Sequence, residues 1–245
     1  MLNAIPDSQI EAARADMAVV LRLTARFDLH EGIDNHFSYA CGDGTFLLNR
    51  WGAHWSRMKR SDILRVDGNG DVLTGAGTIE RTAFMIHEAF HRLCPNAIAV
   101  YHTHMPYATA IACTNPGRLE PVSQNALRYY GQIAYEDIYE GLANDREEGE
   151  RLARAAGDKS IVMLKNHGVM VSGKTIGIAF NDLYFLERSA KVQILAQSSG
   201  AELAMIAHDV AKRTAEQIAE IDEDKETHYQ VLKAMLLEDE PETLN

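Results

Sequence analysis

The chain has 245 residues, 46% of them hydrophobic, which is enough for one large domain with an ample core. Its 24 basic and 35 acidic residues leave a formal net charge of −11, which disfavours nucleic acid as a partner because phosphate backbones are bound by clustered Lys and Arg. Three scattered cysteines without a C-x-x-C pair, no long apolar run and no apolar leader favour a cytoplasmic protein that does not enter a membrane.

The first third of the chain predicts a helix followed by antiparallel strands. Ser8-Gln9-Ile10-Glu11 has the form of a capping box, and apolar positions recur every three or four residues from Ile10 to Phe27, as on a buried helix face. Gly42-Asp43-Gly44 and Gly68-Asn69-Gly70 are typical of hairpin turns. We therefore expect paired strands near 36–41, 45–50, 63–67 and 71–74.

Helices and strands alternate over the following part of the chain. We expect a helix near 78–93, a strand ending at His102, a short helix begun by Pro106, and strands near 119–123 and 132–136. The later elements are a helix bounded by Asp145 and Gly157, a strand ending at His167, and a long helix from about Thr175 to Ser198. This alternation predicts a mixed α/β architecture.

We assign residues 1–200 to the main domain and residues 201–245 to a C-terminal extension of it. The extension is expected to form one or two helices from about Ala201 to Leu237, which could dock on a neighbouring subunit. The acidic residues 238–242 are expected to form a solvated end.

Two histidines at spacing i, i+2 follow an apolar run that is typical of a strand. The run Ala97-Ile98-Ala99-Val100-Tyr101 leads into His102-Thr103-His104. In a strand, His102 and His104 leave the same face, and at a rise of about 3.3 Å per residue their rings can converge on one point. Neutral imidazoles are common ligands of zinc, iron and manganese, so the pair predicts half of a metal site. Two unrelated surface histidines are the alternative.

A third histidine completes the expected ligand set. His167 also ends an apolar run, and Gly168 after it allows a sharp turn. Three histidines with open coordination positions are the arrangement of catalytic rather than structural zinc. We therefore expect a divalent metal, most simply Zn²⁺, with Mn²⁺ or Fe²⁺ as alternatives. Taken alone, His167 would be a capped loop histidine.

These histidines stand in a longer pattern that resembles the class II aldolase and adducin head-domain family, and most closely its adducin-like bacterial branch. The resemblance covers about residues 10–200 and rests on Asn35-His36-Phe37-Ser38, Leu47-Leu48-Asn49-Arg50-Trp51-Gly52, Val66-Asp67-Gly68-Asn69-Gly70, residues 86–95, His102-Thr103-His104, residues 123–131, Asn166-His167-Gly168 and residues 183–188. It implies a three-layer α/β/α sandwich with a central mixed, largely antiparallel sheet. It also implies metal ligation by His102, His104 and His167, and a homotetramer with active sites between subunits.

The chain departs from this family at positions that matter for chemistry. By ungapped counting from His102, the glutamate that serves the family aldolases as ligand and proton-transfer group is here Ala83. Their small phosphate-binding groups are replaced by Trp51-Gly52 and Arg81-Thr82. A sugar phosphate is therefore disfavoured. Arg81, or Arg50, could instead bind a substrate carboxylate through two oxygens, although a solvated Arg81 beside Glu80 is the simpler interpretation.

The resemblance implies a lyase that breaks a carbon–carbon bond, by decarboxylation or retro-aldol cleavage, in a small oxo or hydroxy carboxylate through a metal-stabilised enolate. Loss of the glutamate favours decarboxylation, which needs a proton donor but no base for a hydroxyl. The candidate proton-transfer residues are His36, Tyr130 or its neighbour Tyr129, and Glu88 as a substitute base. By resemblance, the turn that contains His36 and Ser38 binds substrate, with Trp51 at its side.

Other interpretations stay open. His87-Glu88-Ala89-Phe90-His91 fits the H-E-x-x-H motif of zinc proteases, but its helical stripe turns toward a core, so we expect His87 and His91 to be packing or supporting residues. A non-catalytic scaffold like the adducin head is a second alternative. The third alternative is an oxygenase with iron held by the same three histidines.

Overall fold

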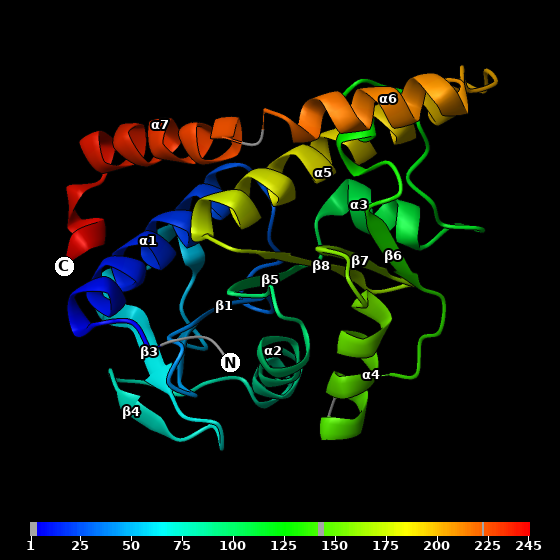
Figure 1. Ribbon diagram of the computed structural model, residues 1–245. Coiled ribbons are helices and arrows are strands. Elements are labelled where there is room, and N and C mark those ends of the chain that lie inside the picture. The colour runs from blue at the N-terminus through cyan, green and yellow to red at the C-terminus, as the bar shows by residue number, and fades with distance from the viewer. Residues whose placement is uncertain (1–3, 142–144, 222) are drawn as a thin grey trace.

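The computed structural model describes residues 4–141, 145–221 and 223–245, and its middle layer is an eight-stranded sheet (Figure 1). In chain order the strands are β1 (His36–Ala40), β2 (Phe46–Asn49), β3 (Ile63–Val66), β4 (Val72–Thr74), β5 (Ala99–Thr103), β6 (Ile133–Glu136), β7 (Ile161–Leu164) and β8 (Gly168–Gly173). They lie in the order β4-β3-β2-β1-β5-β8-β7-β6. Neighbouring strands are antiparallel except β6 and β7, which are parallel. The sheet is therefore mixed and largely antiparallel, as the sequence predicts.

Helices cover both faces of this sheet (Figure 1). One face carries α1 (Asp7–Arg26), α3 (Pro106–Ala112) and α5 (Ile176–Ser198), with α6 (His208–Ala219) and α7 (Glu223–Asp239) outside them. The other face carries α2 (Arg81–Leu93) and α4 (Arg146–Ala156). Short 3-10 segments are η1 (Trp55–Arg57), η2 (Arg60–Asp62), η3 (Ala126–Tyr129) and η4 (Pro241–Leu244). The fold is the expected three-layer α/β/α sandwich.

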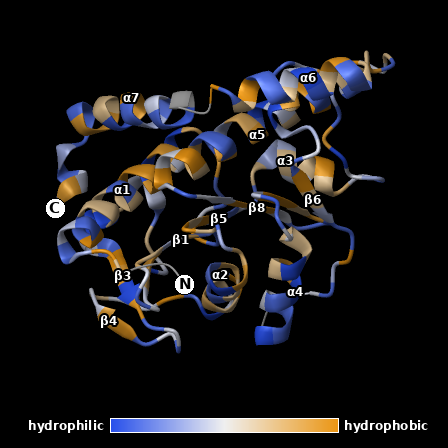
Figure 2. Ribbon diagram, in the orientation of Figure 1, coloured by the Kyte–Doolittle hydropathy of each residue, from blue (hydrophilic) through white to orange (hydrophobic). Residues whose placement is uncertain are grey.

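The alternation of side chains along the strands divides the core between the two faces. In β5, Tyr101 packs with apolar side chains of α1 and α5, whereas Val100 packs with those of α2 and α4. Hydrophobic residues accordingly concentrate in the inner strands, while the outer helices carry mixed faces (Figure 2). His102 lies two positions after Val100, so its side chain leaves the sheet on the side of α2 and α4.

Several local expectations were wrong. The first helix begins at Asp7 after Pro6, whose carbonyl accepts from the backbone of Gln9 and Ile10, so Ser8 does not form a capping box. The run before His167 forms β7, which ends at Leu164, and His167 lies in the turn to a second strand, β8, that the sequence did not predict.

No strand forms at 119–123, because this segment binds side chains instead of a neighbouring strand. The backbone N–H of Leu119 donates to the hydroxyl of Tyr135, and that of Glu120 donates to Oε1 of Gln193 at 2.7 Å. Pro121 has no N–H to contribute to a ladder.

The acidic C-terminal end is docked rather than solvated. Arg22 of α1 is 4% exposed, and its guanidinium binds the carboxylates of Glu240 and Glu242, the latter at 2.9 Å. The backbone oxygen of Asn245 also accepts from the N–H of Ser61 at 3.1 Å. In addition, α7 packs on α1 and α5 of the same chain. The extension thus completes one outer layer of the sandwich.

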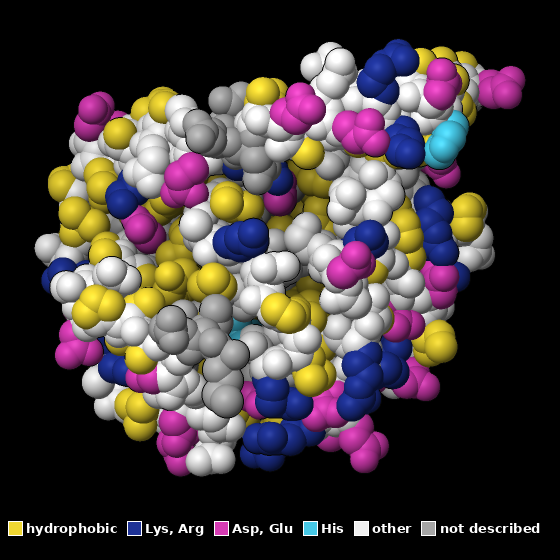
Figure 3. Space-filling view, in the orientation of Figure 1, with side chains coloured by type: hydrophobic (Ala, Val, Ile, Leu, Met, Phe, Trp, Pro, Cys, Tyr) yellow, Lys and Arg dark blue, Asp and Glu magenta, His cyan; other side chains and the backbone are white. Residues whose placement is uncertain are grey.

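The surface mixes charges of both signs. On the face shown in Figure 3, Lys and Arg side chains are interspersed with Asp and Glu rather than gathered in one basic patch. Within the described residues, no helix is both long enough and apolar enough to cross a bilayer.

Candidate metal centre

The three candidate ligands lie where the end of one strand meets the start of its neighbour. His102 is in β5 and His104 follows that strand, while His167 occupies the turn that leads into β8. β5 and β8 are antiparallel, with His102 opposite Met170. The end of β5 and the start of β8 therefore meet, and residues far apart in the sequence become neighbours.

The turn before β8 depends on two residues. Asn166 has φ of 55°, in the left-handed region that Asn tolerates better than most residues. A Cβ added at Gly168 would lie 2.5 Å from the carbonyl oxygen of Thr103 and 2.9 Å from Cδ2 of His104. Asn166 therefore makes the turn that the sequence analysis assigned to Gly168, and Gly168 allows the backbone to approach β5.

The imidazole nitrogens of the three histidines converge. One ligand atom each from His102, His104 and His167 lies within 4.8 Å of the other two. Nε2 of His102 and Nε2 of His104 are 3.0 Å apart. Two nitrogens that share a metal at about 2.0–2.1 Å lie roughly 3 Å apart, so this spacing fits a shared ion.

A backbone carbonyl orients the most buried of these rings. Nδ1 of His102 lies 3.0 Å from the carbonyl oxygen of Val169, which can only accept a hydrogen bond. Nδ1 therefore carries the hydrogen, and Nε2 of the neutral ring keeps its lone pair for a ligand.

Burial keeps the rings neutral. It lowers the pKa of His102 well below its usual range, with a further decrease from the neighbouring histidines, and it lowers the pKa of His104. Burial, followed by His104, lowers the pKa of His167 to about 4. All three imidazoles are thus available as metal ligands at neutral pH.

His36 lies against this centre. It is the cross-strand partner of His102, and the two rings stack with centroids 4.8 Å apart. Burial lowers the pKa of His36 well below its usual range, and nearby histidines add to this effect. The structure therefore places this predicted catalytic residue beside the candidate ligands.

A row of buried polar side chains continues from His36 toward α2. Nδ1 of His36 lies 2.6 Å from Nε2 of His87, and Nδ1 of His87 contacts Oγ of Ser38. The same Oγ lies 2.7 Å from Nε2 of His91, whose Nδ1 is 2.7 Å from the carbonyl oxygen of Ala97. We call His36, His87, Ser38 and His91 the histidine row. The hydroxyl of Ser38, expected to contact substrate, is engaged in this row, so its direct role in binding stays a prediction.

The zinc-protease alternative does not match this geometry. Both ring nitrogens of His87 and of His91 are taken up by hydrogen bonds within the histidine row or to Ala97. The carboxylate of Glu88 instead pairs with Arg92 at 2.9 Å, and Arg92 also contacts Glu150 of α4. Glu88 thus lies in the α2–α4 contact, and its catalytic role stays a prediction.

The other three residues expected to bind substrate lie around the end of β2 and the start of α2. The backbone N–H of Trp51 donates to the carbonyl oxygen of Thr78 at 2.8 Å, which joins the two segments, and the Trp51 side chain is 51% exposed. Arg81 is exposed at the first position of α2, whereas Arg50 already pairs with Asp62 at 2.7 Å. Among the described residues, no direct contact links these three to the candidate ligands.

Tyr130 is brought to a different part of the chain. It follows η3, and its hydroxyl lies 2.8 Å from Nδ1 of His208 in α6. The two side chains border a cavity of about 590 Å³ that Arg128 and Lys212 also line. A catalytic role for Tyr130 would therefore require a neighbouring subunit, and this stays a prediction. Tyr129 is buried and donates to the carbonyl oxygen of Asp182, which indicates packing.

Tyr139 is a further neighbour of the candidate centre, and its position was not predicted from the sequence. Its exposed ring lies 6.3 Å, centroid to centroid, from the ring of His167. It follows β6, and no periodic pattern in its segment points to the centre. Only the parallel pairing of β6 with β7 reveals the contact, because that pairing brings the residues after both strands together.

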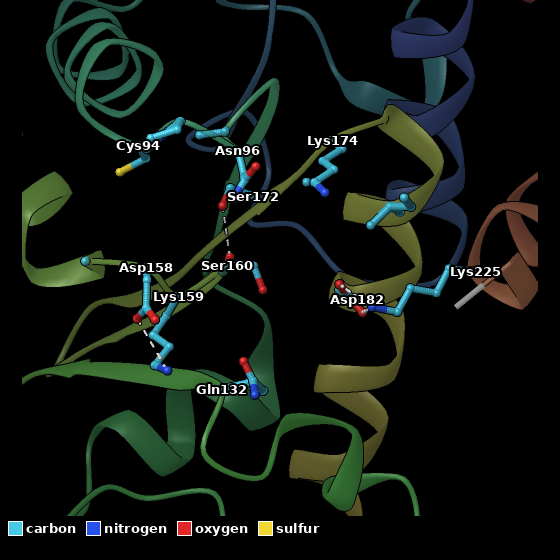
Figure 4. A pocket seen from close by; sticks show the side chains of 15 residues that line it. Cys94, Asn96, Gln132, Asp158, Lys159, Ser160, Ser172, Lys174, Asp182 and Lys225 are labelled. Carbon is cyan, nitrogen blue, oxygen red and sulfur yellow. Dashed lines mark hydrogen bonds and ion pairs between the residues drawn. The ribbon is translucent and has the colours of Figure 1, made fainter. Parts of the chain in front are cut away.

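A second cavity, of about 230 Å³, lies at the opposite ends of the same strands (Figure 4). Asn96, just before β5, and Ser172, near the end of β8, line it together with lysines and aspartates. Lys159 pairs with Asp158 at 3.3 Å, and Lys225 pairs with Asp182 at 3.2 Å. Within each of these pairs the charges offset each other, Lys174 adds a further positive charge, and the cavity is separate from the histidine centre.

The chain matches known proteins over most of its length. Residues 15–194 match the family model described as the class II aldolase and adducin N-terminal domain. A Pseudomonas aeruginosa protein named as a class 2 aldolase is 32% identical over 224 residues, which cover 89% of this chain and 86% of that protein. The crystal structure of an aldolase II superfamily protein from Pseudomonas syringae has a TM-score of 0.87 at 31% identity, covering 94% of this chain and 93% of that chain.

Two Streptomyces relatives are named for reactions. Decarboxylase NovR from Streptomyces niveus is 29% identical over a stretch covering 71% of this chain and 64% of that protein. A 4-hydroxy-3-prenylphenylpyruvate oxygenase/4-hydroxy-3-prenylbenzoate synthase from Streptomyces roseochromogenus is 30% identical over a stretch covering 71% of this chain and 62% of that protein. From the extent of the family match and these identities, the chain belongs to the class II aldolase and adducin family.

Proposed function

We propose that this protein is a metal-dependent lyase that breaks a carbon–carbon bond in a small, unphosphorylated oxo or hydroxy carboxylate. The convergence of His102, His104 and His167 within 4.8 Å carries the proposal. A scaffold protein has no chemical need for three imidazoles aimed at one point, whereas a catalytic metal site does.

The donor set fits a divalent cation. The three rings are neutral, and the bond from His102 to Val169 leaves a lone pair at Nε2. We expect zinc, with manganese or iron as alternatives. When bound, such a cation supplies Lewis-acid stabilisation of the negative charge that develops as the carbon–carbon bond breaks.

Proton transfer falls to the side chains of the protein. The position that the resemblance assigns to a glutamate is Ala83, which is 1% exposed and offers no base for a substrate hydroxyl. Decarboxylation needs no such base, only a later proton donor. His36, stacked on His102, is the group that we assign to this transfer, with Tyr139 or a neighbouring subunit's tyrosine as further candidates. This set of residues favours decarboxylation over retro-aldol cleavage.

Arg81 is our candidate for recognition of the substrate carboxylate. Its side chain is exposed at the start of α2, and its planar guanidinium matches two carboxylate oxygens. Arg50 is the weaker candidate because Asp62 already occupies it. The name of the Streptomyces niveus relative, a decarboxylase, supports the reaction class.

A substrate screen tests the proposal. Zinc-loaded protein would be offered oxo and hydroxy acids beside sugar phosphates, with release of CO2 and of aldehyde measured separately. We expect CO2 from a carboxylate, and a loss of about tenfold in kcat/KM for Arg81→Lys, since a bond to a charged group contributes roughly 1.5–3 kcal/mol. Arg57→Lys, an equally conservative change at another exposed arginine, is the control. Rapid cleavage of a sugar phosphate that is insensitive to Arg81→Lys would contradict the proposal.

An oxygenase is the second candidate, and the Streptomyces roseochromogenus relative favours it by name. The same three histidines would hold iron. Metal analysis of protein purified without added metal separates the alternatives. Iron together with oxygen uptake supports an oxygenase, zinc or manganese supports the lyase, and absence of metal supports an adducin-like scaffold.

A further inference from the structure

The histidine row contains four hydrogen bonds in series. They link His36 to His87, His87 to Ser38, Ser38 to His91, and His91 to the carbonyl oxygen of Ala97. His87 and Ser38 have no exposed surface. Buried polar groups that are fully satisfied in this way lock one another's orientation.

The positions of the hydrogens follow from the end of the row. The carbonyl oxygen of Ala97 can only accept, so Nδ1 of His91 donates to it, and Nε2 of neutral His91 has a lone pair. The Ser38 hydroxyl must then donate its single hydrogen to that lone pair.

The hydrogen position on Ser38 also determines those on His87 and His36. Because its hydrogen is used, Oγ of Ser38 accepts from Nδ1 of His87, which leaves a lone pair on Nε2 of His87. Nδ1 of His36 donates to that lone pair. Four neutral groups thus supply one hydrogen to each of the four bonds, and only one arrangement of these hydrogens satisfies all four.

The row is neutral because a buried charge there would lack a partner. Among the described residues, no carboxylate forms a hydrogen bond with any member of the row. Burial lowers the pKa of His87 well below its usual range and that of His91 to about 4. An isolated ion in such surroundings is costly, so the neutral order holds at pH 7.

We propose that Ser38, His87 and His91 are positioning residues that hold His36 as its Nδ1–H tautomer, so that Nε2 keeps the lone pair through which His36 takes up a proton at the metal centre and later donates it to the carbon from which CO2 has left. The identity of the bound molecule rests on the proposed function, whereas the hydrogen order does not. The row orients His36 as a carboxylate orients histidines elsewhere.

The hydrogen bond from His91 to the carbonyl oxygen of Ala97 limits the function of the row. Ala97 lies just before β5, the strand that carries His102, so the row ties α2 to the strand of the metal ligands. A backbone carbonyl gives up no proton, so the row cannot conduct protons to solvent. Its function is therefore to fix a tautomer and a ring orientation.

Neutron diffraction from deuterium-exchanged crystals of the zinc-loaded protein observes the order directly. We expect deuterium on Nδ1 of His36, on Nδ1 of His87, and on Ser38 Oγ pointing toward His91. Deuterium on Nε2 of His36 in place of Nδ1 would overturn the proposal.

Ser38→Ala tests whether the row imposes this order. Without the hydroxyl, His87 can also donate through Nε2 to Nδ1 of His36, so we expect a mixture of the two neutral tautomers, with partial deuterium occupancy at each nitrogen of His36. Ser189→Ala is the matched control, since it removes an equally buried hydroxyl that donates to Phe185 in α5. A single Nδ1–H tautomer of His36 in Ser38→Ala would refute positioning by the row.

Kinetics give a second measurement once the screen has found a substrate. Ser38→Ala should lower kcat about ten- to a hundredfold, the usual effect of removing a supporting partner, with KM and zinc content near wild type. Ser38→Thr keeps the hydroxyl and should restore most of kcat. An unchanged kcat in folded Ser38→Ala would contradict the positioning role. If no carboxylate is turned over, the proposed function fails, and the neutron data alone decide the tautomer.

Discussion

His104 is the candidate ligand whose removal tests the metal centre most directly. Its ring lies 4.9 Å from that of His102 and 5.0 Å from that of His167. We expect the zinc content of His104→Ala to be well below one ion per chain after dialysis, because two histidines alone bind the ion weakly. His91→Gln should keep its zinc, since His91 binds Ser38 and Ala97 instead. Metal analysis of the two folded variants measures this, and full zinc content in His104→Ala would refute the ligand assignment.

His91 also predicts how stability depends on pH. Its pKa is about 4 in the folded protein against 6.5 for an ordinary histidine, so the unfolded chain takes up a proton first as pH falls. Stability of the metal-free protein should therefore decrease between about pH 6.5 and 4, by about 1.4 kcal/mol per pH unit for each such group. Other buried histidines add to the slope.

Urea unfolding of the metal-free protein at a series of pH values measures this slope. We expect it to be shallower in His91→Gln than in wild type, because Gln does not titrate. Equal slopes in the two proteins would mean that His91 is not held neutral by the fold.

At the scale of elements, the C-terminal segment is held to α1 by charge. Nε of Arg22 donates to the carbonyl oxygen of Met58 at 2.6 Å, while Nη1 of Arg22 donates to both Glu240 and Glu242. Burial of Arg22 makes the loss of a carboxylate partner costly. We expect Glu240→Gln to lower the free energy of unfolding by about 1.5–3 kcal/mol.

Chemical denaturation measures this effect. Glu238→Gln is the matched control, since Glu238 is an exposed glutamate two residues before Glu240. Equal stabilities of the two variants would show that the tail is not anchored through Arg22.

At the scale of the whole molecule, exposed apolar side chains on α5 and α7 predict assembly. Val192 and Leu195 of α5 are 45% and 55% exposed, and Met235 of α7 is 54% exposed. Contiguous patches of such side chains mark surfaces that another protein covers, and we expect these three to belong to one patch. Together with the family resemblance, they lead us to expect a homotetramer.

Light scattering should give a mass near four times 27.2 kDa. Leu195→Glu places a charge on this surface and should shift the mass toward smaller species. A monomeric wild-type protein would contradict the expected assembly. It would also contradict a catalytic role for Tyr130, which requires a neighbouring subunit.

Periodicity and local motifs were enough to determine much of the architecture. The long apolar stripe between about Thr175 and Ser198 predicted α5, and the Gly-rich turns predicted the antiparallel strands. The alternation rule placed His102 and His104 on one face, and both now lie at the candidate centre. These features depend on neighbours within a few residues, which is why the sequence alone could determine them.

Contacts over long separations were decided only by the tertiary structure. The helical stripe indicated that His87 and His91 turn toward a core, but it could not identify Ser38 and His36, about fifty positions earlier, as their partners. The binding of the acidic tail by Arg22 and the approach of Tyr139 to His167 were hidden for the same reason. A residue's local pattern shows which face it occupies, whereas its partner depends on the order in which strands and helices pack.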